Sequence, residues 1–314
     1  MLRTLWNRLS RPARLPSTRP RGEVKLALRD VQHRYRNDVE ALKSVSMEVH
    51  AGEFVCLLGP SGCGKSTLLY ALAGHVTPSA GTLLVDGNAI HGPSPDRLLM
   101  FQEASLFPWL TVKQNLTFPL RAKGLSRAAA DIRALDYLHQ VALDGFERAL
   151  PHELSGGMRM RVSLARALAM DPAVLLMDEP FAPLDAQTRA NMHGLLQSVW
   201  LRSRKTVVFV THNIRESLVL GDRVVVMAGR PGRVLYELQV DLPRPRDADD
   251  PRLVHLERQI LEVLKRAQAA TQSRGPRTGS EADGGELGSE TADSTQLAAT
   301  ELRLRASRPL GSGR

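Results

Sequence analysis

Residues 53–74 constrain the fold most, because an apolar run, a glycine-rich loop and a helical pattern follow one another directly. The run EFVCLLG (53–59) has the length of a buried strand, and LLYALAG (68–74) reads as a helix that ends at its glycine. Between them, GPSGCGKST (59–67) matches the spacing G-x-x-x-x-G-K-[ST]. A strand that passes through such a loop into a helix is a building unit of α/β proteins.

Further apolar runs indicate that the strand at 53–59 belongs to a parallel sheet. These runs are AVLLMDEP (173–180), TVVFVTH (206–212) and DRVVVMAG (222–229). Each is bounded by polar or turn residues, and continuous apolar runs suit strands that helices cover on both faces. The sequence therefore predicts a parallel sheet as the centre of the fold.

The remaining patterns predict two additions to this sheet. The segments before residue 55 and around GTLLVDG (81–87) alternate between apolar and polar residues, which favours an antiparallel flank. Helical patterns at 126–142 and 155–170 lie between the first buried strand and the later ones. We therefore expect an α/β fold with an antiparallel β flank and a helical subdomain inserted at about 103–170.

The net charge of +9 lies mainly at one end of the 314-residue chain. Residues 1–22 contain six arginines and no acidic residue, whereas residues 267–314 contain six arginines and six acidic residues. Residues 23–266 therefore keep a net charge of about +3 (9 − 6 − 0). A charge this small argues against a dedicated DNA- or RNA-binding surface.

Composition separates both ends of the chain from the middle. Residues 1–22 are rich in Arg and Pro and are expected to form a basic flexible tail. The helical spacing of Leu2, Leu5, Trp6 and Leu9 leaves open a membrane-surface helix or a targeting segment. Residues 267–314 are rich in Gly, Ser, Thr and Ala and are expected to be disordered. The folded domain is thus predicted at 23–266.

Several classes of protein are disfavoured by what the chain contains. Its two cysteines, Cys56 and Cys63, cannot form a disulfide framework or a zinc cluster. No apolar run approaches the length of about eighteen residues that a membrane-spanning helix needs. A role at a membrane would therefore require a separate partner.

The loop at 59–67 has the residue types of a phosphate-binding site. The candidate ligand-binding residues are Gly59, Pro60, Ser61, Gly62, Cys63, Gly64, Lys65, Ser66 and Thr67. Glycines let backbone N–H groups surround an anion, and the start of the following helix adds positive partial charge. Lys65 would reach the β- and γ-phosphates of a nucleotide, and Ser66 would offer its hydroxyl to Mg²⁺. The alternative is a glycine-rich turn without a ligand. At a helix start, the pKa of the Cys63 thiol is expected to fall.

Two adjacent acids end the apolar run at 173–180. We expect Asp178 to bind a water ligand of Mg²⁺ or to lie in the second shell of the ion. We expect Glu179 to polarise the attacking water. Successive side chains that leave a strand diverge, so the two acids can take different roles. The alternative is an acidic surface turn.

A second helix start, LSGGM (154–158), also has the composition of an anion site. Ser155 is placed to cap the helix, and Gly156 and Gly157 would let a phosphate approach the backbone. The nucleotide already has its loop at 59–67, so this second site needs other phosphates. A dimer in which each helix start faces the nucleotide of the other chain would supply them.

With these motifs, residues 24–266 resemble an ATP-binding cassette (ABC) ATPase subunit of a membrane transporter, a phosphate-loop NTPase, and LSGGM resembles the signature motif of that family. The resemblance implies four further sites, at Tyr35, Gln102, Asp185 and His212. Tyr35 would stack on adenine, although it could be an ordinary strand aromatic. Gln102 would reach Mg²⁺ or water, and Asp185 lies in the segment FAPLDAQTR that resembles the D-loop. His212 would hydrogen-bond the γ-phosphate, and its alternative is a structural histidine.

The chain departs from the family pattern in two motifs. Met158 stands where the signature usually has glutamine, and Met160 replaces a second polar residue. Ala182 and Pro183 replace the small or hydroxylated pair that usually precedes Leu184. Neither change removes a catalytic group. Pro183 is expected to stiffen the D-loop, which would affect communication between the two ATP sites more than ATP binding.

The resemblance also implies partners and a location. The cofactors would be ATP and Mg²⁺. Two ATPase subunits would form a homodimer or pseudo-dimer at the cytoplasmic face of the membrane. An integral-membrane permease and a separate solute-binding protein would complete the transporter. The apolar segment 105–124 would receive the permease, unless it is subdomain core. The stretch 240–264, together with FQEASLFPW (101–109), resembles the branch of the family that imports nitrate, sulfonate, taurine or bicarbonate. The alternative is a soluble regulatory or repair ATPase.

Overall fold

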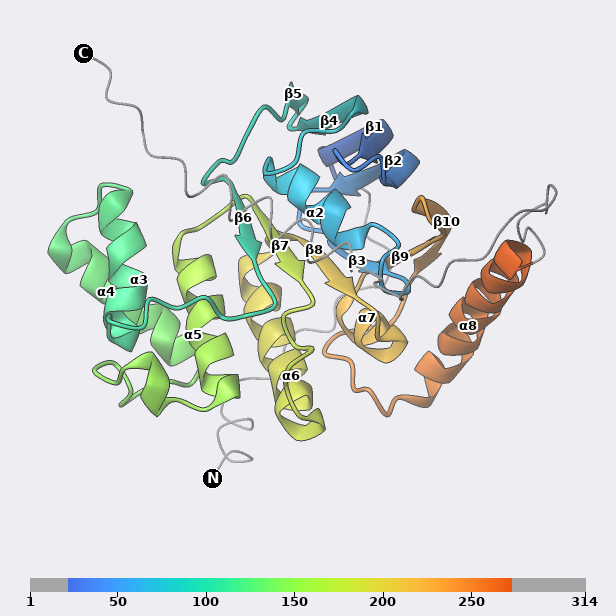
Figure 1. The fold of residues 1–314 in the computed structure, drawn as a ribbon. Helices are drawn as coiled ribbons and strands as arrows, with labels where there is room; N and C mark the ends of the chain where they lie inside the picture. Colours follow the sequence, from blue (N-terminus) through green and yellow to red (C-terminus); the bar gives the residue numbers. More distant parts are fainter. Residues whose placement is uncertain (1–21, 273–314) are drawn as a thin grey trace, which may run out of the picture.

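The computed structural model describes residues 22–272, which form two sheets and the helices around them (Figure 1). A six-stranded sheet has the order β10-β9-β3-β8-β7-β6, in which all neighbours are parallel except β10 and β9. Its strands are β3 (Phe54–Leu58), β6 (Arg97–Met100), β7 (Val174–Asp178), β8 (Thr206–Thr211), β9 (Arg223–Ala228) and β10 (Arg233–Gln239). The parallel sheet predicted from the apolar runs is therefore confirmed.

A four-stranded antiparallel sheet flanks this centre, as the alternating segments predicted. Its order is β2-β1-β4-β5, with β1 (Val24–Arg34), β2 (Glu40–His50), β4 (Ala80–Val85) and β5 (Asn88–Ala89). Gly232, in the turn between β9 and β10, joins the two sheets: its N–H donates to the Ala41 carbonyl over 2.9 Å, and its own carbonyl accepts from Lys43 N over 3.0 Å. This junction lies directly beside the 59–67 loop.

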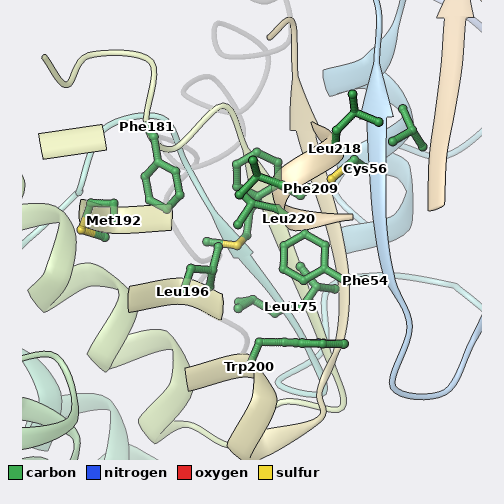
Figure 2. Close-up of a cluster of buried hydrophobic side chains, with 14 of the residues drawn as sticks. Phe54, Cys56, Leu175, Phe181, Met192, Leu196, Trp200, Phe209, Leu218 and Leu220 are labelled. Atoms are coloured by element: carbon green, nitrogen blue, oxygen red, sulfur yellow. The ribbon is translucent and has the colours of Figure 1, made fainter. Parts of the chain in front are cut away.

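Strand alternation explains why the parallel strands read as continuous apolar runs. In β3, Phe54 and Cys56 face a cluster with Phe209 and Trp200, whereas Val55 and Leu57 face a cluster beneath α2 (Lys65–Ala73). Figure 2 shows the first cluster, where helix α6 (Ala186–Ser203) packs its apolar side chains against the sheet. Both faces of each central strand are buried, so neither face can be polar.

The segment between the second sheet and β7 contains the helices of the predicted subdomain. These are α3 (Val112–Ala122), α4 (Arg127–Gln140), the short 3-10 helix η1 (Pro151–Glu153) and α5 (Gly156–Ala169). They enclose a core of their own, formed by residues such as Leu116, Leu138 and Val162. In Figure 1 this subdomain lies at the β6 side of the parallel sheet.

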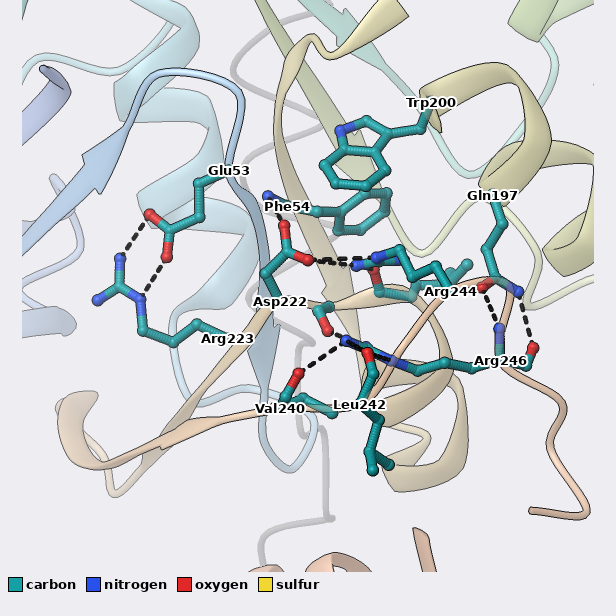
Figure 3. A network of polar contacts seen from close by, with 12 residues as sticks. Glu53, Phe54, Gln197, Trp200, Asp222, Arg223, Val240, Leu242, Arg244 and Arg246 are labelled. Carbon is teal, nitrogen blue, oxygen red and sulfur yellow. Dashed lines mark hydrogen bonds and ion pairs between the residues drawn. The ribbon is translucent and has the colours of Figure 1, made fainter. Parts of the chain in front are cut away.

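Two buried arginines fasten the C-terminal part of the domain to the rest (Figure 3). Arg244 pairs with Asp222 at 3.0 Å and stacks on the Trp200 ring, with its guanidinium carbon 4.5 Å from the ring centroid. Arg246 donates to backbone carbonyls at the end of α7 (Ile214–Leu220), and Gln197 binds the Arg246 backbone. The last helix, α8 (Pro251–Gln272), follows this segment and packs on α7.

The predicted tails fall largely outside the described residues. The basic tail assigned to 1–22 lies outside them except for its last residue, and so does the 273–314 part of the C-terminal tail. Helix α8 continues to Gln272, beyond the predicted domain end at residue 266. Within residues 22–272, none of the helices combines the length and apolar character needed to span a bilayer.

Candidate active site

The 59–67 loop connects the end of β3 to the start of α2, as predicted. Gly64 is the N-cap of α2 with φ +89°, and no side chain caps this helix start. By contrast, each of the helices α3 to α7 begins with a side-chain cap. The first N–H groups of a helix need an acceptor, and an anion can supply it. The start of α2 therefore fits a phosphate group.

Close packing behind the loop requires the glycine at position 64. A Cβ atom there would lie 2.7 Å from the Ala41 carbonyl oxygen, and the positive φ would strain any other residue. The loop is thus pressed against the strand β2, while Pro60 and Ser61 are exposed on its outer side. This arrangement leaves the backbone of the loop available to a ligand on that side.

Lys65 points back along the loop. Its Nζ donates to the carbonyl oxygens of Gly59 and Pro60, each over 2.9 Å, and lies 4.0 Å from Glu179 Oε1. The Lys65 side chain is only 4% exposed. A buried ammonium beside the loop adds positive charge where phosphates would bind.

Ser66 and Asp178 form the pair that fits a divalent cation. Ser66 Oγ donates to Asp178 Oδ1 over 3.0 Å, which brings the start of α2 to the end of β7. Burial raises the pKa of Asp178, and the hydrogen bonds from Ser66 and Tyr70 oppose that rise. A hydroxyl and a carboxylate are the hard oxygen ligands that Mg²⁺ prefers. Tyr70 was not predicted, although it lies one helical turn after Ser66 on the same face.

Glu179 and His212 form a second pair at the same edge of the sheet. Glu179 Oε2 lies 2.7 Å from His212 Nδ1, and the two residues directly follow the adjacent parallel strands β7 and β8. The Glu179 backbone has φ +43°, an uncommon conformation for a residue with a side chain. Such a conformation costs free energy and persists only where the surrounding structure holds it in place. Residues of this kind cluster at functional sites.

Gln102 and Tyr35 lie near this edge, but the roles expected for them stay predictions. Gln102 is exposed and comes two residues after β6, the strand that pairs with β7. Tyr35 is buried, with 6% exposure, and its hydroxyl lies 2.8 Å from Thr67 Oγ1. Adenine could meet only the small exposed part of this ring.

The residues of the second predicted anion site form a separate group. Ser155 is the N-cap of α5, as predicted, and its Oγ accepts from Met158 N over 3.3 Å. Gly157 packs against the first turn of α6: a Cβ atom there would lie 2.5 Å from Thr188 Cγ2. Asp185 is the N-cap of that helix and accepts from Thr188 N over 2.9 Å.

Gly156 and Gly157 therefore serve different purposes. Packing on α6 within the chain explains why position 157 excludes a side chain, whereas the side chains nearest to a Cβ atom at Gly156 would be 3.9–4.0 Å away. An intrachain clash does not account for the glycine at 156. A ligand that approaches the α5 start would account for it.

The expectation that the pKa of the Cys63 thiol falls is wrong. Cys63 is 1% exposed, and burial raises the pKa of its thiol more than Lys65 and the backbone hydrogen bonds lower it. Its Sγ lies 3.7 Å from the Met227 carbonyl oxygen, on the inner side of the loop. Desolvation outweighs the helix start here because the side chain points into the core.

Comparisons with known proteins agree with this geometry. Residues 42–182 match the family model described as ABC transporter. An ABC transporter ATP-binding protein of Methanocaldococcus jannaschii, itself uncharacterized, is 44% identical and aligns with 79% of this chain and 94% of its own. The nitrate import ATP-binding protein NrtD of Synechocystis sp. is 46% identical, over 71% of this chain and 84% of its own.

A taurine import protein and a solved structure extend the comparison. The taurine import ATP-binding protein TauB of Rhizobium johnstonii is 45% identical, over 76% of this chain and 92% of its own. The solved structure is a dimeric ATP-binding cassette in a post-hydrolysis state bound to ADP and Pi. It has a TM-score of 0.61 and 32% identity, and the match covers 68% of this chain and 98% of that one.

Proposed function

The chain belongs to the ABC transporter family of ATPases, and from this membership we propose that it is the ATP-hydrolysing subunit of an importer for a small anion. The observation that carries the proposal is the convergence of the Lys65 loop, the Ser66–Asp178 pair and the Glu179–His212 pair at one edge of the sheet. Relatives named for nitrate and taurine import support the choice of an importer.

The phosphates of ATP would bind at the 59–67 loop. Backbone N–H groups at the start of α2 and the Lys65 ammonium would hold the β- and γ-phosphates. Ser66 and Asp178, with Gln102, would hold Mg²⁺, which neutralises charge on the phosphates during transfer. Tyr35 would contact the adenine.

Glu179 would orient and polarise the attacking water. Its Oε1 is 4.0 Å from Lys65 Nζ, and its Oε2 is 2.7 Å from His212 Nδ1, so the carboxylate is held between the phosphate loop and the histidine. His212 is 57% exposed on the open side, where its ring can also donate to the γ-phosphate. These are positioning and electrostatic contributions, which dominate phosphoryl transfer.

A second copy of the chain would complete the site. Gly157 packs against the start of α6 and Asp185 caps that helix, whereas the phosphate loop contacts β2 and the β9–β10 turn. The two groups thus have different neighbours within one chain. In a head-to-tail dimer, the α5 start of one subunit would meet the γ-phosphate that the other subunit binds. The dimeric solved structure is a precedent for two cassettes in one assembly.

A membrane permease would couple hydrolysis to transport. The helical subdomain exposes Trp109 (73%) and Phe118 (54%), and both rings contact Phe107, with ring centroids 5.8 and 5.3 Å apart. Exposed aromatic groups of this kind favour a protein contact. The subunit would then lie at the cytoplasmic face of the membrane, with a separate solute-binding protein outside. Nitrate, sulfonate, taurine or bicarbonate would be the transported anion.

Two measurements test this function. Glu179→Gln should retain MgATP, form a stable ATP-bound dimer and lose nearly all hydrolysis, because the amide cannot polarise water. Rapid turnover by that variant would contradict the role of Glu179. Affinity purification of the tagged chain from gently solubilised membranes should recover a multi-span permease at near-equal stoichiometry. Recovery of only soluble partners would favour a regulatory or repair ATPase instead.

A further inference from the structure

A buried hydrogen-bond chain lies behind His212 and begins on another helix. His193, in α6, places Nε2 2.7 Å from Glu216 Oε1. Thr211, at the end of β8, donates from Oγ1 to Glu216 Oε2 over 2.5 Å. The three side chains come from α6, β8 and α7 and meet in the interior, with exposures of 12% for His193 and 7% for Glu216.

The Glu216 carboxylate needs both partners. A carboxylate moved out of water costs several kcal/mol unless donors or an opposite charge compensate it. Among the basic side chains, it is His193 that reaches the Glu216 carboxylate, with Nε2 2.7 Å from Oε1. The imidazole N–H and the Thr211 hydroxyl thus supply the donors that keep this carboxylate in place.

The chain fixes both neighbours of His212. The Thr211 hydroxyl also accepts from Asn213 N over 3.0 Å, and Asn213 Oδ1 accepts from Glu216 N over 3.1 Å. His212 lies between these two residues, and its own ring is 57% exposed. The direction in which that ring projects is therefore set by backbone that the Glu216 carboxylate holds.

The other end of the chain reaches the segment that follows Glu179. The His193 ring lies against the Phe181 ring, with centroids 5.8 Å apart, and Phe181 comes two residues after Glu179. His193 also belongs to α6, the helix that Asp185 caps. The His193 side chain thus contacts Phe181 in the segment after Glu179 and Glu216 in the segment after His212.

We propose that His193 is a positioning residue for ATP hydrolysis: through Glu216 and Thr211 it aligns His212 with Glu179, and it links the Asp185 end of α6 to that alignment. The proposal rests on the function proposed for Glu179 and His212. It predicts that loss of the His193 donor impairs the chemical step without weakening nucleotide binding, because His193 lies outside the phosphate loop.

The test compares two substitutions in the full chain. His193→Gln keeps an N–H donor near the position of Nε2, whereas His193→Leu removes it and keeps an apolar side chain. We expect His193→Leu to lower kcat at least tenfold with KM for MgATP changed less than twofold, and His193→Gln to restore kcat to within threefold of the wild type. Equal kcat in His193→Leu and the wild type would overturn the proposal, as would a loss that His193→Gln does not rescue.

A second pair of variants covers the case in which His193→Leu does not fold. Thr211→Val keeps the β-branched shape in β8 and removes the hydroxyl, and Thr211→Ser keeps the hydroxyl. The chain predicts a loss of kcat in Thr211→Val that Thr211→Ser largely avoids. Where both single variants fold, the double variant should lose little more than either. Multiplicative losses would mean that the two residues act separately and would contradict the chain.

Glu179→Gln in the same assay separates this inference from the proposed function. If Glu179→Gln hydrolyses ATP at the wild-type rate, the assignment of the active site fails, whatever His193 does. If Glu179→Gln is inactive and His193→Leu is fully active, the active site stands and the positioning role fails.

Discussion

Arg246 gives the sharpest stability prediction, because its guanidinium is buried and binds backbone groups alone within residues 22–272. It donates to the carbonyl oxygens of Leu218 (3.0 Å), Val240 (2.7 Å) and Leu242 (3.0 and 3.1 Å), and also to that of Gly221. Burial lowers the pKa of Arg246 to about 9, which is still above neutral pH, so the group stays charged. Figure 3 shows its guanidinium beside the backbone of Val240 and Leu242.

The loss of stability on replacing Arg246 follows from the backbone carbonyl oxygens that would be left without a donor. Arg246→Met keeps an unbranched apolar side chain and removes every guanidinium donor. The carbonyls of Leu218 and Gly221 lie at the end of α7, where the helix itself offers no donor. Each buried acceptor without a partner costs about 1–3 kcal/mol. Because the variant also loses the cost of burying a charge, we expect a net loss of about 2–4 kcal/mol in the free energy of unfolding.

Guanidinium chloride unfolding measures this loss. Trp200 lies beside Arg244 in the same network, so tryptophan fluorescence is a suitable signal. In thermal unfolding, the melting temperature should fall by roughly 5–15 °C, at about 2–4 °C per kcal/mol for a domain of this size. The matched control is Arg258→Met, which removes an exposed arginine from α8 and should change stability by less than about 0.5 kcal/mol. Equal effects of the two substitutions would refute the reasoning.

Two further predictions concern glycines and thiols. Gly157→Ala should be less stable than Gly156→Ala by about 1–3 kcal/mol in chemical unfolding, because only the first places a methyl group 2.5 Å from Thr188 Cγ2. Equal stability of the two would show that Thr188 moves aside freely. Cys63 and Cys56 should react slowly with a thiol reagent at pH 8 in the native protein and rapidly in denaturant, because burial raises the pKa of both thiols. Fast reaction of one thiol in the native state would contradict their burial.

The central fold could be predicted from the sequence because its signals are local. Apolar runs determine which strands are buried on both faces, and the 59–67 spacing identifies the strand-to-helix turn without further information. Helices α3, α6 and α7 were not predicted. Pro119 lies inside α3, and a proline in a helix removes a backbone donor. Helix α6 begins at Ala186, inside the segment FAPLDAQTR (181–189) that resembles the D-loop.

The contacts within the site depend on tertiary structure and were not predictable in detail. The spacing of Asp178 and Glu179 indicated two roles, but the positive φ that directs Glu179 towards His212 leaves no mark in composition. Likewise, arginines in a stretch as rich in proline and charge as residues 240–250 would ordinarily be exposed to solvent. Arg244 and Arg246 are buried instead, because carbonyl oxygens at a helix end and the Asp222 carboxylate accept their hydrogen bonds.

The contacts of Glu216 and those of Arg246 meet on α7, and together they explain how so short a helix can fix the position of His212. Helix α7 has seven residues, and an isolated helix of that length is unstable in water. Its first turn is held by the Glu216 interactions with His193 and Thr211, and its last carbonyls are held by Arg246. His212 directly precedes the capped start of this helix, so its position follows from tertiary contacts at both ends. A change at either end is therefore transmitted to the residue that faces Glu179.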